Sequence, residues 1–292
     1  MTPGPVEAFG TTFQNPILLA AGTAGFGREL AGTIDLEALG GVVTKSVSPE
    51  ARAGNPPPRV AEFPGGMLNS VGLANPGLDV VEREELPWLE RHLRRARVVV
   101  SVVGNTVDDY VTVVARLTDY PVVTAFELNL SCPNTERGGE LFGANDAVLA
   151  DLVERCRSAS RRPVIAKLAP TLPDVGRTAR VAQAAGVDGF AVVNTMPGML
   201  FREGGADGPS REPRLGAGNG GVSGPPLLPV GVLATRRVRE ATGLPVIGVG
   251  GVRRAEDVEA YLTAGAVLVA IGTAALADPR LPERLARRFA GG

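Results

Sequence analysis

Two lysines and one cysteine are the residues of this sequence whose types and positions most suggest chemistry. Of thirty Lys and Arg residues only two are lysines, Lys45 and Lys167, and each ends an apolar run ("GVVTKS", "PVIAKLA"). An ammonium is a compact point charge that can lose its proton, which a guanidinium does not do. We therefore expect both lysines to have a role that arginine could not fill. The alternative is that codon bias left these two lysines by chance and that they are solvated residues at the rim.

The stretch "ELNLSCPNTERGG" (127–139) ends an apolar run in Asn129 and continues into Cys132, Pro133 and Asn134. Turn residues usually follow a buried strand, so a thiol between amides and a proline is unusual there. A thiolate is a nucleophile and a base, and an amide both donates and accepts hydrogen bonds. Cys132 is therefore a candidate reactive group.

Eight short apolar runs separated by helical segments would position these residues. They lack the alternation of a half-exposed strand, which indicates parallel strands buried on both faces. The runs cover residues 16–20, 41–46, 97–103, 125–131, 163–169, 189–195, 244–251 and 266–273.

The segments between the runs carry helix signals. "NTVDDYVTVVARL" and "NDAVLADLVERCRSAS" start with capping residues and acids, "TIDLEALG" opens with Thr33, and three later segments end in glycine. Eight strand–helix units predict a (β/α)8 TIM barrel, whose usual size is about 250 residues. A doubly wound sheet is the alternative, but "AAGTAGFG" lacks the glycine spacing of its first turn.

We expect a single domain over residues 1–292, with residues 1–15 as an extension that caps the base of the barrel. Two inserts, 47–79 and 196–227, are longer than a barrel needs, which is typical of functional or mobile loops.

Active sites of such barrels lie at the carboxyl ends of the strands. The residues that this rule brings together are Lys45, Ser46, Asn129, Cys132, Lys167, Asn194, Thr195, Gly250, Gly251, Gly272 and Thr273. Glycines after the last two strands could bring backbone N–H groups to a phosphate, although tight turns would also use them. Ammonium groups beside a ring that gains negative charge on reduction would stabilise that charge. This suggests that the ligand is flavin mononucleotide (FMN). A Schiff-base lysine enzyme of the aldolase kind is the competing interpretation.

Composition excludes several classes of function. The net charge is −1 and no basic run occurs, so we expect no nucleic-acid or membrane partner. We expect no secretory signal and no membrane span. The two cysteines sit in unlike contexts, so we expect no disulfide framework and a reducing cytoplasm as the location. Cys132, Cys156 and His92 are too few to build an iron–sulfur or zinc site, so we expect no metal. Cys156 and Trp88 are expected to be packing residues and His92 a surface residue.

The sequence resembles the class 1 dihydroorotate dehydrogenases, and among them the 1B type. The resemblance runs from "NPILLAAG" to "VAIGTAALADP" and is most specific in "GMLNSVGLANPGLDVVEREELPWL", "ELNLSCPN", "VVNTMPGM", "GGVSGP" and "GVGG". It implies a TIM barrel that binds FMN and oxidises dihydroorotate to orotate. It also implies that Cys132 is the base that removes a proton from C5 while C6 delivers hydride to the flavin.

The same resemblance assigns the other site residues. Lys45 would contact both flavin and substrate, and Lys167 the electron-rich side of the flavin ring. The substrate would be held by Asn69, Ser70, Val71, Gly72, Leu73, Asn129, Asn134, Asn194 and Thr195. The FMN contacts would be Ala21, Gly22, Ser46, Ser101, Asn129, Val193, Gly224, Gly250, Gly251, Gly272 and Thr273. The loop 133–145 would be a flexible lid.

Two positions depart from the family pattern, both on the flavin side. Ser101 stands where many relatives have asparagine, and Ala21 where a serine often contacts FMN. The 1B type implies a partner subunit with FAD and a [2Fe–2S] cluster that passes electrons to NAD⁺, in a homodimer or heterotetramer, whereas 1A relatives use fumarate. A family member with another dihydropyrimidine or enoate-like substrate, and an inactive scaffold, are the alternatives.

Overall fold

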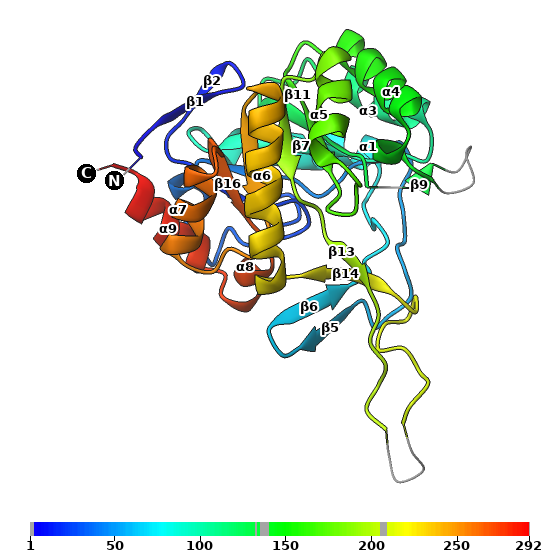
Figure 1. Cartoon of the computed structure of the whole chain (residues 1–292). Helices are drawn as coiled ribbons and strands as arrows, with labels where there is room; N and C mark the ends of the chain where they lie inside the picture. The colour runs from blue at the N-terminus through cyan, green and yellow to red at the C-terminus, as the bar shows by residue number, and fades with distance from the viewer. Residues whose placement is uncertain (1–2, 132, 135–139, 205–208, 292) are drawn as a thin grey trace.

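Eight parallel strands close into a barrel, as predicted (Figure 1). The computed structural model describes residues 3–131, 133–134, 140–204 and 209–291. In barrel order the strands are β3 (Ile17–Leu19), β4 (Gly41–Val43), β7 (Arg97–Val102), β8 (Val123–Asn129), β11 (Val164–Leu168), β12 (Gly189–Val192), β15 (Val246–Val249) and β16 (Leu268–Ile271), and β16 pairs with β3. The strands lie inside the runs expected from the sequence, except that β8 begins at Val123.

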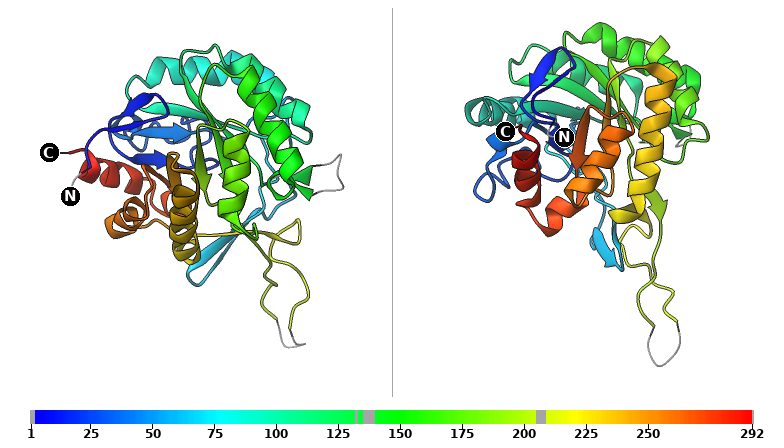
Figure 2. Two further views of the ribbon diagram at one scale, coloured as in Figure 1. Left: turned by 45° about the horizontal axis from the view of Figure 1, so that its top comes forward. Right: turned by 60° about the vertical axis from the view of Figure 1, so that its left-hand side comes forward.

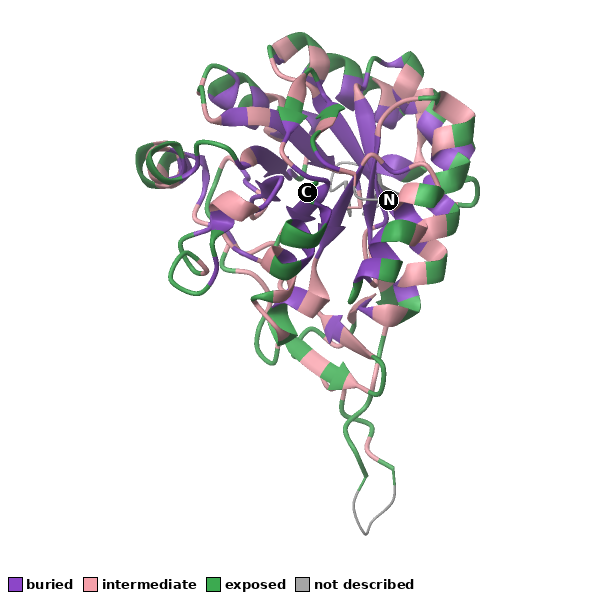
Figure 3. Ribbon diagram, turned by 90° about the vertical axis from the view of Figure 1, so that its left-hand side faces the viewer, coloured by how far each residue is buried: buried purple, intermediate pink, exposed green. Residues whose placement is uncertain are grey.

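Helices surround the barrel and bury their inner faces against it (Figures 2 and 3). They are α1 (Leu78–Val80), α2 (Leu86–His92), α3 (Val107–Leu117), α4 (Asp146–Ala159), α5 (Val175–Ala184), α6 (Leu228–Thr242), α7 (Ala255–Thr263), α8 (Thr273–Ala277) and α9 (Leu281–Phe289), with a π-helical turn η2 (Val81–Glu85) between α1 and α2. Thr106, Asn145 and Asp174 cap α3, α4 and α5 with their side chains. No helix in the described part of the chain has the length and apolar character needed to cross a bilayer.

The prediction of a helix that begins at Thr33 is wrong in both the start and the length of the element. The segment forms only a 3₁₀ turn, η1 (Leu36–Ala38), and its cap is Asp35. A Cβ on Gly40 would lie 2.1 Å from the carbonyl oxygen of Asn15, so the chain passes close to its neighbour there and enters β4 at once. A full helix has no room before that contact.

The N-terminal extension closes the base of the barrel, as expected. Its hairpin pairs β1 (Val6–Ala8) with β2 (Thr11–Phe13). Phe9 and Phe13 join the apolar cluster that fills the barrel, together with Val99 and Ile165. This end of the barrel is therefore packed with side chains and leaves the opposite end for chemistry.

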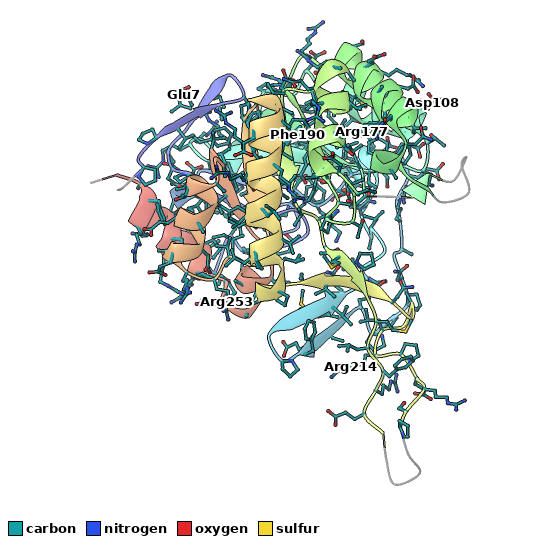
Figure 4. The ribbon with its side chains drawn as sticks, viewed as in Figure 1. Glu7, Asp108, Arg177, Phe190, Arg214 and Arg253 are labelled. Atoms are coloured by element: carbon teal, nitrogen blue, oxygen red, sulfur yellow. The ribbon has the colours of Figure 1, made fainter. Side chains whose placement is uncertain are left out.

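The two long inserts meet in a second sheet beside the barrel (Figure 1). Its order is β13 (Met196–Gly198), β14 (Gly220–Ser223), β6 (Gly66–Asn69) and β5 (Val60–Phe63), all antiparallel. The described residues that follow β13 and precede β14 extend away from the body (Figure 1). Among them Arg214 (Figure 4) donates a 2.7 Å hydrogen bond to the carbonyl oxygen of Glu62. Shorter elements are β9 (Pro133–Asn134), β10 (Glu140–Leu141), η4 (Phe142–Ala144) and η5 (Pro225–Leu227).

Candidate active site

The barrel interior changes from apolar to polar towards the carboxyl ends of the strands. Val99, Ala125 and Ile165 belong to the cluster that fills the barrel. Because side chains alternate along a strand, the next inward positions on the same strands are Ser101, Glu127 and Lys167. All three are buried. The polar level begins one step above the packed core, at the end of the barrel where the expected site residues lie.

Lys167 is held by a carboxylate inside the barrel. Its Nζ donates a 3.0 Å hydrogen bond to Oε1 of Glu127, and both residues are buried. The two strands are neighbours, with Lys167 in register with Asn129 and Ile165 with Glu127. The lysine is therefore an internal charge of the barrel and not a rim residue.

Two of the predicted amides bind each other at the mouth. Nδ2 of Asn194 donates to Oδ1 of Asn129 over 3.0 Å, although the residues are 65 positions apart. The backbone carbonyl of Asn129 accepts a 2.7 Å bond from the hydroxyl of Tyr110, and Oδ1 of Asn194 accepts one from the N–H of Thr195. These bonds fix both amide groups, which are half-buried.

Lys45 follows β4 and is half-buried. Its backbone N–H donates a 2.7 Å bond to the carbonyl of Gly25. Burial lowers the pKa of its ammonium below the usual range; Glu29 opposes that shift and Arg59 adds to it. Arg59 lies in the first insert, so the fold brings a second cation near Lys45, an environment suited to an anionic ligand.

The segment 69–73 follows β6 and borders the second sheet. Nδ2 of Asn69 donates a 3.2 Å bond to the carbonyl of Gly221, and Oγ of Ser70 accepts a 2.8 Å bond from Asn55. Gly72 and Leu73 have φ of 71° and 57°, so the chain turns sharply here and Leu73 adopts a conformation that a leucine rarely takes. Val71 is half-buried within the same turn.

Gly221 ties this segment to Thr195. A Cβ on Gly221 would lie 2.0 Å from Oγ1 of Thr195, so only glycine permits this approach. Asn69, Gly221 and Thr195 therefore form one contact chain, which joins the first insert to the end of β12. The sequence predicted Asn69 and Thr195 in one site; it did not predict Gly221, through which the small sheet brings them together.

The glycines after β15 and β16 are candidates for a cradle of backbone N–H groups. Gly250 and Gly251 have φ of 119° and 79°, and a Cβ on Gly251 would lie 2.5 Å from the backbone nitrogen of Leu228. A Cβ on Gly224 would lie 3.7 Å from Cγ2 of Thr273, which follows Gly272. Within the described part of the chain, the N–H groups of Gly251, Gly272 and Thr273 donate no hydrogen bond. Such donors fit an anion such as a phosphate.

The remaining predicted cofactor residues line the same end of the barrel. Oγ of Ser46 and Oγ of Ser101 are 2.8 Å apart and share a hydrogen bond. Gly22 is exposed with a φ of 80°, Ala21 is half-buried, and Val193 donates its N–H to the carbonyl of Val249. Ser101, which departs from the family pattern, is thus bonded to a predicted FMN residue.

Cys132 lies outside the described residues, and of Asn134 only the backbone, in β9, is described. The described residues before Cys132 fix where its segment leaves the barrel. The N–H of Leu130 donates to the carbonyl of Lys167, and the carbonyl of Leu130 accepts from Gly143. The segment therefore starts directly beside Lys167.

The structure confirms that Cys156 and Trp88 are packing residues and that His92 is a surface residue. Cys156 is fully buried in α4, and burial raises the pKa of its thiol to about 12. His92 is exposed, stacks on Trp88 with 4.3 Å between ring centroids, and hydrogen-bonds through Nδ1 to the carbonyl of Trp88. Trp88 packs partly buried against the core.

Sequence reasoning missed four residues at this end of the barrel: Glu127, Tyr110, Asn55 and Arg59. Glu127 had a signal, because an acid within an otherwise apolar run that is buried on both faces requires a partner. The other three reach the site by contacts between distant segments, which no local pattern indicates.

Comparison with known proteins gives the family. A family model described as "Dihydroorotate dehydrogenase" matches residues 5–290. The chain is 44% identical over 274 residues to the "Dihydroorotate dehydrogenase B (NAD(+)), catalytic subunit" of Geobacillus kaustophilus, covering 94% of this chain and 85% of the relative. The protein of the same name from Bacillus cereus (strain B4264) is 43% identical, with 94% and 86% covered.

A solved structure shares the fold. It is the dihydroorotate dehydrogenase of Eimeria tenella in complex with ferulenol, with a TM-score of 0.79 and 24% sequence identity. The superposition covers 98% of this chain and 83% of that one. This likeness supports the barrel architecture.

Proposed function

Because the chain belongs to the dihydroorotate dehydrogenase family, we propose that it oxidises dihydroorotate to orotate in pyrimidine biosynthesis, with FMN as its cofactor. Its relatives of the B (NAD(+)) type carry that activity in their name. The observation that carries the proposal is the arrangement of the barrel mouth: the only two lysines, a bonded amide pair and a glycine cradle meet at one end.

The residues at the mouth fit FMN. The backbone N–H groups of Gly251, Gly272 and Thr273, which donate no hydrogen bond within the described residues, suit its phosphate. The close approach of α6 requires glycine at Gly251. The Lys167 ammonium is an internal positive charge that suits a ring which becomes more negative on reduction. When bound, FMN would supply the hydride acceptor. The other residues assigned to it are Ala21, Gly22, Lys45, Ser46, Ser101, Asn129, Val193, Gly224 and Gly250.

The residues assigned to the substrate would orient its ring and hold its carboxylate. Asn129 and Asn194 are already fixed by their mutual bond, so little conformational freedom is lost when a ring with alternating donors and acceptors binds. Lys45, with Arg59 nearby, would attract the carboxylate, and segment 69–73 with Thr195 would offer backbone and side-chain donors. Asn134 would complete the set from the segment after Cys132.

Cys132 would act as the base that takes the proton from C5. A thiolate is favoured by neighbouring cations, and the described chain before Cys132 is joined to Lys167 by a bond from the N–H of Leu130 to the backbone carbonyl of Lys167. General-base catalysis of this kind contributes about 10²–10⁴-fold to rate. The segment 133–145 would close over the substrate as a lid.

The electron acceptor would be NAD⁺, reached through a partner subunit. The name "catalytic subunit" of the relatives implies a second subunit. Two cysteines cannot ligate a [2Fe–2S] cluster, so FAD and the cluster would be held by that partner. We further propose a cytoplasmic location and a homodimer or heterotetramer.

The test is to purify the chain and follow cofactor and product together. We expect a yellow protein that releases FMN on denaturation and forms orotate from dihydroorotate with an artificial electron acceptor. A colourless protein that cannot be reconstituted with FMN would contradict the cofactor assignment. FMN-loaded protein that forms no orotate would contradict the substrate assignment.

A further inference from the structure

Glu127 is a buried acid for which the reaction described above has no role. It is 1% exposed in the interior of the barrel, and its Oε1 lies 3.0 Å from Nζ of Lys167, which is 7% exposed. Glu127 is in register with Ile165, two residues before Lys167. The carboxylate therefore starts from a backbone position one inward step nearer the base and contacts the ammonium within the polar level.

Stability alone does not account for this pair. Removing two charges from water costs about as much as their attraction returns, so apolar replacements of buried pairs are often neutral or stabilising. Inward neighbours elsewhere in the barrel are apolar, among them Ala191, Val249 and Ala270. An ammonium buried without a counter-charge would lose its proton more easily.

We propose that Glu127 is a positioning residue for Lys167, which keeps the Lys167 ammonium charged and fixed at the floor of the mouth. The part of this proposal that concerns FMN rests on the proposed function, because the contact between Lys167 and the flavin ring is part of that function. The part that concerns the lysine itself does not depend on a bound cofactor.

Few other charges can compensate for a loss of Glu127. On the strands that flank Lys167, its register partners are Asn129 and Ala191, which carry no charge. The other lysine of the mouth, Lys45, is influenced by Glu29 and Arg59. Among the described residues, Glu127 provides the one anion in contact with Lys167.

The chain itself offers a direct assay, because it has only two lysines. Protein labelled with ¹³C at lysine Cε should give two resonances, and Lys167→Arg removes one of them and so assigns both. We expect the chemical shift of the Lys167 resonance to change at a lower pH in Glu127→Gln than in the parent chain, because the buried ammonium has lost the carboxylate that contacts it. The Lys45 resonance should stay unchanged.

The matched control is Glu90→Gln, the same chemical change on an exposed residue of α2. It should shift neither resonance. If the Lys167 resonance of Glu127→Gln moves at the same pH as in the parent chain, the proposal is wrong. This readout needs no bound FMN, so it decides about Glu127 even if the cofactor assignment fails.

A second measurement connects the pair to the flavin. In FMN-loaded protein, Glu127→Gln should make the two-electron midpoint potential of FMN fall more steeply with pH, because Lys167 then takes up a proton from solvent when the flavin is reduced. In a Lys167→Met background, adding Glu127→Gln should change neither the potential nor its slope.

This pair of variants also decides the matter if Glu127→Gln alone does not fold. Glu127→Gln/Lys167→Met has no unpaired buried charge, and in Lys167→Met the side chain of Glu127 can be buried as the neutral acid. Equal potentials for Lys167→Met and the double variant support the proposal. A change that persists without Lys167 shows that Glu127 acts on something else, and overturns it.

Discussion

At the scale of single residues, the site depends on how burial changes the chemistry of a few side chains. Burial shifts the pKa of the Lys45 ammonium and the pKa of the Cys156 thiol in opposite directions. Burial favours the neutral form of each, which lowers the pKa of the ammonium and raises that of the thiol. Lys45 lies in the candidate site, whereas the raised thiol pKa keeps Cys156 from reacting.

The lowered pKa of Lys45 predicts how ligand binding depends on pH. Below that pKa the ammonium is charged and attracts the carboxylate of orotate; above it the amine is neutral and the attraction is lost. Orotate binding should therefore weaken as pH rises, and at a lower pH than an ordinary lysine, with its pKa of about 10.4, would allow. Calorimetric titration of orotate across this range measures the effect.

Lys45→Arg is the matched variant, because a guanidinium stays charged above pH ~12. It should bind orotate with a flatter pH profile in the alkaline range, whatever its affinity. An equally steep profile in Lys45→Arg would assign the pH dependence to another group.

Cys156 should be inert in the folded chain. With a thiol pKa raised to about 12, almost no thiolate exists near neutral pH, and the side chain is fully buried. In a Cys132→Ala variant we expect iodoacetamide at about pH 8 to label no thiol until the protein is unfolded, when one is labelled. Mass spectrometry counts the adducts, and rapid labelling of the native variant would refute the assignment.

At the scale of elements, glycines set how closely strands and helices approach one another at the mouth. Gly251 brings the end of β15 against the start of α6, and Gly221 brings β14 against Thr195. Both contacts join segments that are distant in the sequence. The site is therefore held by backbone approaches as much as by its polar side chains.

Gly251→Ala should lower both stability and FMN affinity. The new Cβ would lie 2.5 Å from the nitrogen of Leu228 at a φ of 79°. Left-handed backbone and crowding together cost about 2–5 kcal/mol. Displacing the backbone N–H groups of the candidate cradle should weaken FMN binding by roughly tenfold or more. Denaturant unfolding and fluorescence titration of FMN measure the two effects.

Gly243→Ala is the control for backbone strain alone. Gly243 ends α6 with a φ of 69° and has nothing within 4 Å of the added Cβ. It should lose about 1–2 kcal/mol and keep its FMN affinity. Equal FMN affinities for the two variants would contradict the role of the cradle.

The sequence predicted the barrel because parallel strands buried on both faces leave continuous apolar runs such as "RVVVSVV". It did not predict the second sheet. The strands "GMLN" and "GGVS" are short and rich in glycine, and their pairing of Asn69 with Gly221 joins residues 152 positions apart. Likewise the Glu127–Lys167 pair follows from the register of β8 and β11, which local patterns do not contain.

At the scale of the whole molecule, the barrel is packed at one end and polar at the other. The N-terminal hairpin fills the base with Phe9 and Phe13, while the two inserts build a sheet beside the mouth. The candidate site therefore lies at one end of the barrel, and we expect the proposed partner subunit to approach that end. Electron transfer to NAD⁺ would therefore depend on assembly with the proposed partner subunit, because FAD and the iron–sulfur cluster would be bound there.

The proposed partner predicts a strict requirement. Dihydroorotate-dependent reduction of NAD⁺ should occur only when a subunit carrying FAD and an iron–sulfur cluster is added or copurifies, whereas artificial dyes should be reduced without it. Spectrophotometric assays with and without the partner measure this. Rapid NAD⁺ reduction by the isolated chain, or fumarate as the better acceptor, would contradict the proposal.

The central claim is that this chain oxidises dihydroorotate at a flavin with Cys132 as the base. Its most direct test is anaerobic mixing of FMN-loaded protein with dihydroorotate, followed by flavin absorbance. The account predicts fast bleaching in the parent chain and bleaching about 10²–10⁴-fold slower in Cys132→Ala with FMN still bound. A parent flavin that is not bleached by dihydroorotate, or a Cys132→Ala variant bleached at the parent rate, would contradict it.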